Sequence, residues 1–309
     1  MSFKYNGVEI VDTYAEGFSM WGSRIIITAL NRKWANIAAQ NMTGFATSVI
    51  ACDCEAGLER EIPAEETPDG RPGAAVMVFG FSREKLAGSM LARIGQCVLT
   101  CPTTAIFNGL EKNESEYMLE VGKSLRFFGD GFQVKMRMGD GLGDRGRFWR
   151  IPVMEGEFLT DEKYGAKKGV AGGNFLVMGR DEESTLEAAE RAINAIHTVP
   201  FVITPFPGGL CRSGSKVGSK YAFLKASTNI PFCPTIKHAH MNSKIPEQVN
   251  SVIEIVFNGL NEDSVKKATG VGLKAATEVK GIVSITAVNF DGKLGKFKIG
   301  LKECLEGVQ

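Results

Sequence analysis

The sequence carries almost no net charge, because its 36 basic and 35 acidic residues leave a balance of +1. Proteins that bind nucleic acid or an anionic membrane through their overall field have a marked basic excess, so we expect neither partner. No apolar run approaches the ~18 residues that span a membrane. Residues 1–7 also lack the apolar core of a secretory signal. We therefore expect a cytoplasmic protein.

Cysteine and histidine are not spaced like metal ligands. The seven cysteines and three histidines contain no Cys-x2-Cys or His-x3-His pair, so we expect no metal site. Their closest spacings, 52–54, 97–101 and 238–240, are typical of buried structural thiols and solvated histidines. Cys97 or Cys101 is a candidate nucleophile, but no histidine lies nearby in sequence to activate it. An odd number of cysteines without a secreted-domain spacing predicts reduced thiols.

Two nucleotide-binding signatures are present only in part. Gly141-Leu-Gly-Asp-Arg-Gly146 matches G-x-G-x-x-G, but a strand with a proline follows where a helix must begin. We interpret it as a hairpin turn. Residues 209–216 resemble a P-loop, but an extra serine precedes Lys216, and Val217 replaces the required hydroxyl residue. Neither segment predicts a nucleotide site.

The periodicity of the apolar residues predicts the same order of elements twice. In the first half we expect strands at 24–30, 44–52, 74–81 and 97–107, and helices at 31–43 and 82–94. In the second half we expect strands at 174–179, 200–204, 249–257 and 282–290, and helices at 182–197 and 262–278. The helix N-caps are Asn31, Ser82, Asp181 and Asn261. Leu186 is among the residues expected to face inward.

A β-α-β-β-α-β order is that of the ferredoxin-like unit. We therefore predict an α+β fold with two ferredoxin-like lobes from an internal duplication, 1–150 and 151–309. Each lobe has an insert between its second and third strands. Residues 121–154 lie outside both repeats, and we expect them to form a β-hairpin region of extended segments, beginning at 123–128, that joins the lobes.

The two inserts are rich in residues suited to ligand binding. The first contains Glu66-Thr-Pro-Asp-Gly-Arg-Pro-Gly73, and the second contains residues 204–209 followed by 213–221. Glycine and proline fix tight turns, while Ser, Thr, Lys and Arg supply donors for carboxylate or phosphate. The alternative is a pair of surface loops with ordinary turns. Long loops inside a compact lobe are more often functional.

At these residues the sequence closely resembles the formylmethanofuran–tetrahydromethanopterin formyltransferase family of methanogenic archaea and methylotrophic bacteria. The resemblance extends from about residue 8 to about residue 303. The segments that carry it, in matching order, are 43–50, 66–73, 93–104, 152–159, 172–175, 204–209, 213–221 and 252–256.

The resemblance implies a duplicated ferredoxin-like fold and a formyl transfer from methanofuran to tetrahydromethanopterin, in the one-carbon metabolism that includes methanogenesis. It implies no metal and no prosthetic group, with the two carriers as co-substrates. It also implies a homo-oligomer, a dimer or tetramer, with the site at a subunit interface. Association with other formyl-pathway subunits is a further expectation.

Formyl transfer between two amines requires a proton carrier, an oxyanion stabiliser and positioning groups. Glu254 is the candidate proton carrier, because it lies in the apolar strand Val252–Phe257, where burial raises a carboxyl pKa. The alternative is a solvent-facing or ion-paired Glu254 with a structural role. A glutamate at the matching position of the family supports the catalytic role.

The remaining candidates come from the predicted strand ends and the inserts. Gln96, Thr103 and Thr104 are candidate oxyanion donors, and hydrogen bonds within turns are their alternative role. The residues expected to bind substrate are Thr67, Asp69, Arg71, Thr103, Pro207, Gly208, Ser213, Ser215, Lys216 and Lys220. Arg71, Arg212, Lys216 and Lys220 are suited to the anionic tails of the carriers.

Two further functions stay open on sequence grounds. One is a non-catalytic paralogue that binds a pterin or organises a complex. The other is a different formyl or acyl transferase on the same scaffold. An intact Glu254 and complete inserts favour the enzyme.

Overall fold

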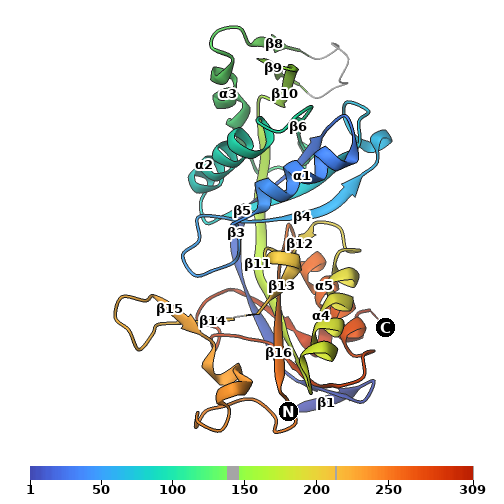
Figure 1. Cartoon of the computed structure of the whole chain (residues 1–309), viewed down its shortest axis with the longest axis vertical. Coiled ribbons are helices and arrows are strands. Elements are labelled where there is room, and N and C mark those ends of the chain that lie inside the picture. Colours follow the sequence, from blue (N-terminus) through green and yellow to red (C-terminus); the bar gives the residue numbers. More distant parts are fainter. Residues whose placement is uncertain (138–145, 213, 309) are drawn as a thin grey trace. The chain divides into compact units, whose positions relative to one another are not determined.

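The computed structural model describes residues 1–137, 146–212 and 214–308. The chain forms two compact units. Unit 1 comprises Met1–Ser19, Ser48–Cys52 and Val170–Gln309, and unit 2 comprises Met20–Thr47 and Asp53–Gly169. Two long strands, β3 (Tyr14–Thr28) and β11 (Tyr164–Gly179), belong in part to each unit (Figure 1). The division into 1–150 and 151–309 follows the sequence halves and stays a prediction.

Unit 2 is an α+β assembly around four antiparallel strands in the order β4-β5-β3-β6. Its principal elements after β3 are α1 (Arg32–Thr43), β4 (Glu55–Ile62), β5 (Gly73–Gly80), α2 (Arg83–Arg93) and β6 (Ala105–Asn108). Beyond β6 the sheet continues through β10 (Gly156–Asp161), β9 (Phe148–Val153) and β8 (Val134–Met136). The shorter elements are η1 (Ala64–Glu66), the π-helical η2 (Ile94–Val98), β7 (Tyr117–Leu119), α3 (Val121–Leu125) and η3 (Arg126–Gly129).

Unit 1 repeats this order around strands paired as β12-β16-β11-β17. Its principal elements after β11 are α4 (Glu182–Ile196), β12 (Val202–Ile203), β16 (Ser251–Gly259), α5 (Glu262–Ala276) and β17 (Ile282–Thr286). The chain's first strands, β1 (Ser2–Tyr5) and β2 (Val8–Val11), extend the sheet from β17. The chain ends with β18 (Phe297–Gly300) and α6 (Leu301–Glu306).

The second insert of the chain, residues 204–250, belongs to unit 1. It contains η4 (Pro207–Gly209), β13 (Leu210–Cys211), β14 (Ser215–Val217), β15 (Ala226–Thr228), η5 (Ile230–Phe232) and η6 (Pro234–Ile236). β13 pairs with β16, whereas β14 and β15 form a hairpin that projects from the unit (Figure 1).

In both units the first strand of the repeat lies between the third and the fourth, and the helices connect strands in the same places. This arrangement confirms the predicted α+β fold with a repeated β-α-β-β-α-β order. The four predicted N-caps are also confirmed, since each side chain accepts the N–H three residues further on.

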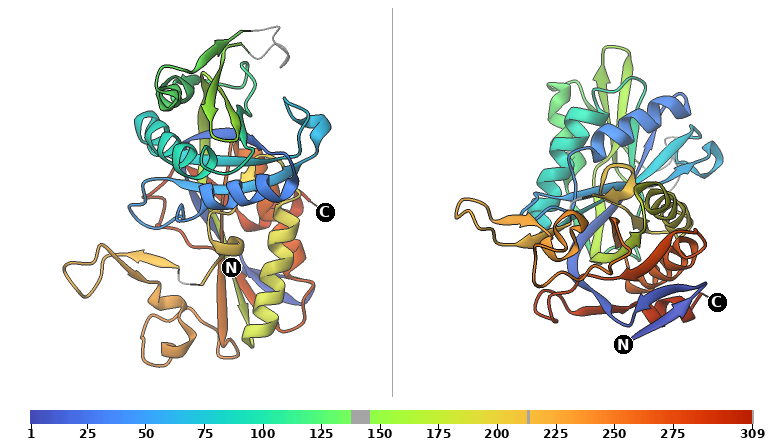
Figure 2. Two further views of the ribbon diagram at one scale, coloured as in Figure 1. Left: turned by 45° about the horizontal axis from the view of Figure 1, so that its top comes forward. Right: turned by 60° about the horizontal axis from the view of Figure 1, so that its bottom comes forward.

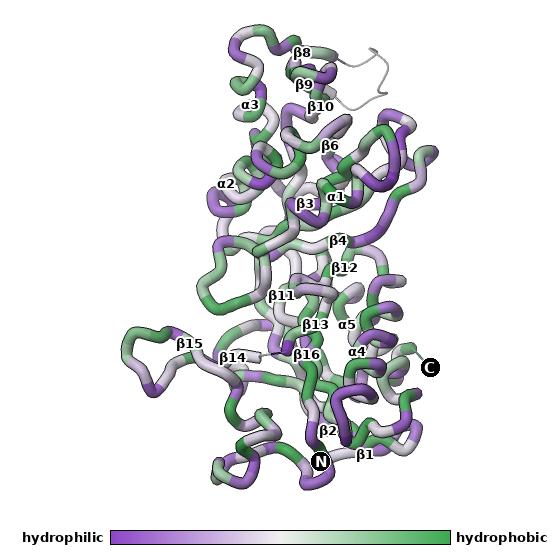
Figure 3. The backbone as a smooth tube through the Cα atoms, viewed as in Figure 1, coloured by the Kyte–Doolittle hydropathy of each residue, from purple (hydrophilic) through white to green (hydrophobic). Residues whose placement is uncertain are grey.

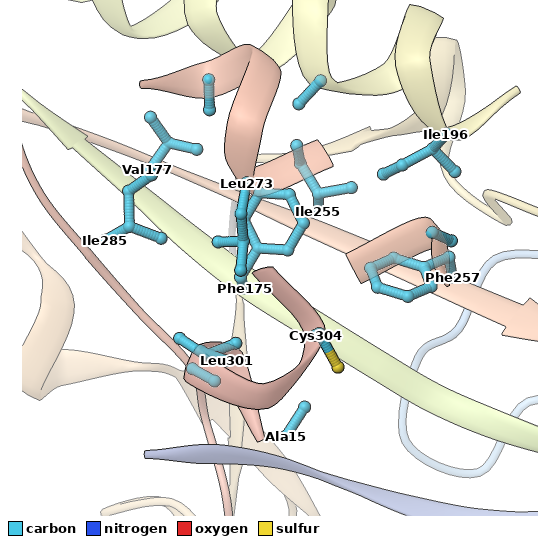
Figure 4. Packing of buried hydrophobic residues seen from close by; sticks show 14 of the residues in the cluster. Ala15, Phe175, Val177, Ile196, Ile255, Phe257, Leu273, Ile285, Leu301 and Cys304 are labelled. Carbon is cyan, nitrogen blue, oxygen red and sulfur yellow. The ribbon is translucent and has the colours of Figure 1, made fainter. Parts of the chain in front are cut away.

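The core of unit 1 lies between the sheet and helices α4 and α5, which cover one face of it side by side (Figure 2). Phe175 of β11 and Phe257 of β16 meet edge to face with ring centroids 6.1 Å apart. Leu273 and Leu301 reach the same cluster from α5 and α6 (Figure 4). Each fully buried side chain of this size contributes about 1.5–3 kcal/mol through removal of apolar surface from water. Figure 3 shows the alternation of polar and apolar residues along α4 that this packing requires.

A buried carboxylate ties the start of the chain to its end. Glu16 of β3 accepts main-chain N–H groups from Phe290 and Gly292 at 2.8 and 2.9 Å, from Gly295 at 2.6 Å, and also from Leu294. Burial acts to raise the Glu16 pKa, but these hydrogen bonds prevail and lower it. The charged form of Glu16 is therefore the form that holds the loop.

The predicted strand at 44–52 is wrong. These residues form turns, and the second strand of the repeat is β4. Phe45 and Ala51 have positive φ values of 62° and 70°, which a strand does not allow. The apolar run is typical of a strand, but Phe45 is 95% exposed and pairs with no sheet.

Two more segments predicted as extended are helical at their start. Residues 97–104 belong to η2 and the turns after it, so only residues 105–107 of the predicted strand at 97–107 join the sheet, as part of β6. Segment 123–128 lies in α3 and η3, whereas β8 and β9 pair antiparallel as the predicted hairpin requires. The segment 141–145 of the glycine-rich motif lies outside the described residues. Leu186, expected to face inward, is 44% exposed, since α4 buries Thr185 and Ala189 instead.

Candidate active site

Glu254 lies at the centre of the unit 1 sheet. It is paired with Leu176 of β11 on one side and with Cys211 of β13 on the other. Neighbouring side chains of a strand point to opposite faces, and Ile255 points into the core beneath α4 and α5. Glu254 therefore points to the other face of the sheet, which the second insert covers.

A small cavity lies over Glu254. Its volume is about 30 Å³, which accommodates one or two water molecules or a one-carbon group. The lining residues are Leu176, Cys211, Arg212, Gly214, Thr228, Asn229, Phe232, Cys233, Val252 and Glu254. Sheet and insert thus enclose the carboxyl group together.

Gly214 of the insert lies directly against the Glu254 carboxylate. A β-carbon at this position would overlap Glu254 Oε2, so any larger residue here would force the carboxylate or the chain to shift. None of the described residues forms a hydrogen bond with the Glu254 carboxylate. Because burial is not offset by such bonds, it raises the Glu254 pKa to about 7.

A carboxyl group with this pKa is about evenly divided between its acid and base forms at neutral pH. It can therefore accept a proton and return it within one reaction cycle. The alternative was an ion-paired Glu254. Among the described residues, no lysine, arginine or histidine forms a salt bridge with Glu254, so this alternative is not supported. These are the properties that the predicted role of Glu254 requires, and the role itself stays a prediction.

The first insert forms a separate cluster in unit 2. Arg71 donates from Nε to Asp69 Oδ2 at 2.8 Å, from Nη1 to the Thr103 carbonyl at 2.6 Å, and from Nη2 to Thr28 Oγ1 at 3.1 Å. Thr28 Oγ1 in turn donates to Asp69 Oδ2 at 2.8 Å. Thr67 Oγ1 donates to the Arg71 carbonyl at 2.6 Å. Thr67, Asp69 and Arg71, all predicted to bind substrate, therefore lie together, and the Arg71 side chain stabilises the turn through these hydrogen bonds.

The candidate oxyanion donors of unit 2 are largely occupied. Thr104 is buried, and its hydroxyl donates to the carbonyls of Val98 and Cys101 at 2.6 and 3.0 Å. The Thr103 N–H donates to Glu155 Oε1. Gln96 lies in the π-helical turn with an exposed side chain. The Thr104 hydroxyl is thus used in hydrogen bonds within the turn, which was its alternative role. Of the three candidate oxyanion donors, Gln96 is the one with an exposed side chain.

The candidates of the second insert fall around the Glu254 cavity and along the hairpin. Pro207 and Gly208 form the exposed turn that leads into β13. Ser215 and Lys216 lie in β14 and are paired with Thr228 and Ser227, while Lys220 is exposed near the tip. Ser213 lies outside the described residues.

Sequence reasoning missed Thr228, Asn229 and Phe232, which line the cavity from the end of the hairpin and from η5. No local pattern distinguishes them from other loop residues. Their role depends on the path of the insert across the sheet. Cys211 and Cys233 line the same cavity, whereas the predicted candidate nucleophiles Cys97 and Cys101 do not.

Among residues 1–137, 146–212 and 214–308, no three His, Cys, Asp or Glu side chains cluster in a way that could hold a metal ion. Within the same ranges, no helix is long and apolar enough to cross a membrane.

Comparison with known proteins gives a consistent result along the chain. Residues 3–153 match the family model "Formylmethanofuran-tetrahydromethanopterin formyltransferase", and residues 156–304 match the model "FTR, proximal lobe". The formyltransferase of Methanocaldococcus jannaschii is 52% identical over 304 residues, which cover 97% of this chain and 99% of that protein. The enzyme of Methylobacillus flagellatus is 51% identical with the same coverage.

Solved structures agree with the sequence comparison. The formyltransferase of Methanosarcina barkeri superposes with a TM-score of 0.91 at 49% identity, covering 98% of this chain and all of that one. A chain of the formyltransferase/hydrolase complex of Methylorubrum extorquens, solved with methylofuran, has a TM-score of 0.93 at 45% identity and covers 99% of each chain. The chain belongs to the formylmethanofuran–tetrahydromethanopterin formyltransferase family.

Proposed function

We propose that this enzyme moves a formyl group between formylmethanofuran and tetrahydromethanopterin by direct transfer, with Glu254 as the proton carrier. The acceptor nitrogen attacks the formamide carbon to give a tetrahedral oxyanion, which collapses when the departing amine takes up a proton. Glu254 receives the proton of the attacking amine and gives it to the leaving amine. The observation that carries this role is the carboxyl group with a pKa near 7 in a cavity of one-carbon size.

The cavity also offers an oxyanion stabiliser. The Asn229 carboxamide lines it beside Glu254, and no hydrogen bond to its side chain is formed by the described residues. Side-chain amides serve as oxyanion donors in acyl transfer, where loss of one such donor lowers kcat by about 10²–10³-fold. Gln96 of unit 2 stays a second candidate. The proposed mechanism calls on no metal and no prosthetic group.

Glu254→Gln tests the proton carrier. Transfer from formylmethanofuran to tetrahydromethanopterin is followed spectrophotometrically, with a chelator present. We expect kcat to fall by about 10²–10⁴-fold, with circular dichroism unchanged. Glu187→Gln, which alters an exposed glutamate of α4, is the matched control and should keep full activity. Normal turnover in a folded Glu254→Gln protein would refute the role.

A homo-oligomer is the second part of the proposal. The β14–β15 hairpin carries four exposed apolar residues around its tip, Val217, Tyr221, Phe223 and Leu224, and Figure 3 shows this apolar segment. Phe223 is 81% exposed, and its ring lies 5.9 Å from that of Tyr221. Exposure of these apolar side chains to water is unfavourable, and an exposed apolar patch on a projecting hairpin is typical of a subunit contact. We assign it to a second copy of this chain.

The oligomer is tested by sedimentation of Phe223→Ser beside Lys225→Ser, which changes a charged residue of the same hairpin. Dissociation of the Phe223 variant alone would support the assignment, and an unchanged mass would contradict it.

The Methylorubrum extorquens neighbour occurs in a complex with other subunits. We propose that this chain also associates with other subunits of the formyl pathway. The seven free cysteines suit a reducing cytoplasm.

A further inference from the structure

The second insert carries a strong positive charge that the nearly neutral chain as a whole does not show. Residues 204–250 contain six of the 36 basic residues and only one of the 35 acidic residues, so the insert has a net charge of +5. The remaining 30 basic and 34 acidic residues give the rest of the chain a charge of −4. The low net charge of the chain therefore results from two opposite charges in different segments. The basic residues of the insert are Arg212, Lys216, Lys220, Lys225, Lys237 and Lys244.

These cations have no carboxylate partner in the described part of the chain, where none of them forms a salt bridge. Lys237 Nζ donates to the main-chain carbonyls of Glu247 and Val249 at 2.6 and 3.1 Å, but carbonyl groups do not cancel its charge. Because the charges stay uncompensated, their potential extends into solvent over about one Debye length, which is ~8 Å at physiological salt. The exposed members are Arg212, Lys220, Lys225 and Lys244.

Three of the cations lie next to the small cavity over Glu254. Arg212 is itself one of the residues that line this cavity. Lys244 Nζ lies 5.7 Å from the ring centroid of Phe232, whose side chain lines the same cavity. Lys216 belongs to β14, which directly follows the cavity-lining segment in the sequence. The positive charge is therefore placed on the segments that enclose the proposed reaction centre.

The positive charge of the insert does not act on the proton of Glu254. A cation within about 4–6 Å of a carboxylate lowers its pKa. Burial instead raises the Glu254 pKa to about 7, and no cation among the described residues counteracts this effect. The cations are therefore available to attract anionic groups outside the cavity.

A positive region around a site attracts anions from solution and raises their association rate by about 10- to 1,000-fold, an effect that salt screens. The carriers of the proposed formyl transfer are matching ligands, because each has a tail with carboxylate or phosphate groups. We infer that the second insert steers these anionic carriers toward Glu254 before any contact is made. This inference rests on the proposed function for the identity of the ligands. The alternative is a contact role, in which one or two lysines bind the tail of the carrier after it has arrived.

The first test measures kcat/KM for each carrier between about 20 and about 300 mM KCl. Steering acts on the encounter, so kcat/KM should fall about tenfold across this range while kcat stays constant. The double variant Lys220→Gln/Lys244→Gln should have a kcat/KM about threefold to fivefold below wild type at low salt, and no difference at high salt. Lys280→Gln, which removes an exposed lysine between α5 and β17, should follow wild type. An equal salt dependence in wild type and double variant would contradict the inference.

A binding measurement separates steering from contact and does not depend on catalysis. Tetrahydromethanopterin is passed over the immobilised full-length protein in a biosensor, and its association and dissociation rates are recorded separately. A lower association rate in the double variant, with an unchanged dissociation rate, supports steering even if formyl transfer itself proves absent. A change confined to the dissociation rate would show that the lysines bind the carrier by contact. A wild-type association rate that is independent of salt would show that no steering occurs. Either result overturns the inference.

Discussion

Gly214 packs directly against the carboxylate of Glu254, so that a β-carbon at this position would overlap Glu254 Oε2 unless one of the two shifts. We predict that Gly214→Ala displaces the carboxyl group or the start of the hairpin and lowers kcat at least tenfold. Gly88→Ala is the control, because a β-carbon there would meet no atom within 4 Å. Full activity of Gly214→Ala would mean that the position of the carboxylate is not critical.

The raised pKa of Glu254 predicts a pH-dependent stability. The folded protein holds this proton up to about pH 7, whereas an ordinary glutamate releases it near 4.5. Since the folded state binds the proton more tightly, the free energy of unfolding falls as pH rises from 4.5 to 7. The total loss is about 3 kcal/mol.

Glu254→Gln removes this titration. Its free energy of unfolding should exceed that of wild type by an increasing amount between pH 5 and 8 in urea titrations at fixed protein concentration. Glu187→Gln should follow wild type throughout. Parallel curves for wild type and Glu254→Gln would show that the Glu254 pKa is not raised.

The Arg71 cluster predicts a clear difference between two arginines of the same insert region. Arg71→Ala leaves the nearly buried Asp69 carboxylate without its cation, which should lower the free energy of unfolding by about 2 kcal/mol. Arg60 forms an ion pair with Glu66 in which both side chains are more than 40% exposed. Arg60→Ala should cost less than about 1 kcal/mol. Equal effects in urea denaturation would indicate that the cluster does not stabilise the turn.

Helix α5 provides the fourth prediction. A β-carbon at Gly270 would overlap the Cys304 carbonyl oxygen of α6, so Gly270→Ala should be destabilising by about 1–3 kcal/mol despite the better helix propensity of alanine. Gly88→Ala in the exposed interior of α2 should instead stabilise by about 0.5–1 kcal/mol. Thermal melting checks both predictions: relative to wild type, the Tm of Gly270→Ala should fall and the Tm of Gly88→Ala should rise.

The sequence predicted features that depend on local chemistry. The four N-caps follow from one side chain and the three residues after it, and Glu254 is conspicuous as a charge within an apolar strand. The prediction of a strand at 44–52 was wrong because it also used local chemistry alone. The apolar residues of this segment are typical of a strand, but Phe45 is exposed in the folded chain. Asn229 and Phe232 could not be found in this way, since only the path of the folded insert across the sheet brings them to the site.

The hydrogen bonds between Glu16 and the loop at 290–295 also have a consequence for synthesis. Glu16 and Gly292 are 276 residues apart in the sequence. At a ribosomal rate of about 5–20 residues per second, the first strands wait on the order of tens of seconds before their partners emerge. Unit 2 is complete by Gly169 and can fold during this interval. Unit 1 can close only after β17 and β18 have left the ribosome, so the edges of β2 and β3 that these strands cover are the part of the nascent chain that a chaperone would have to shield.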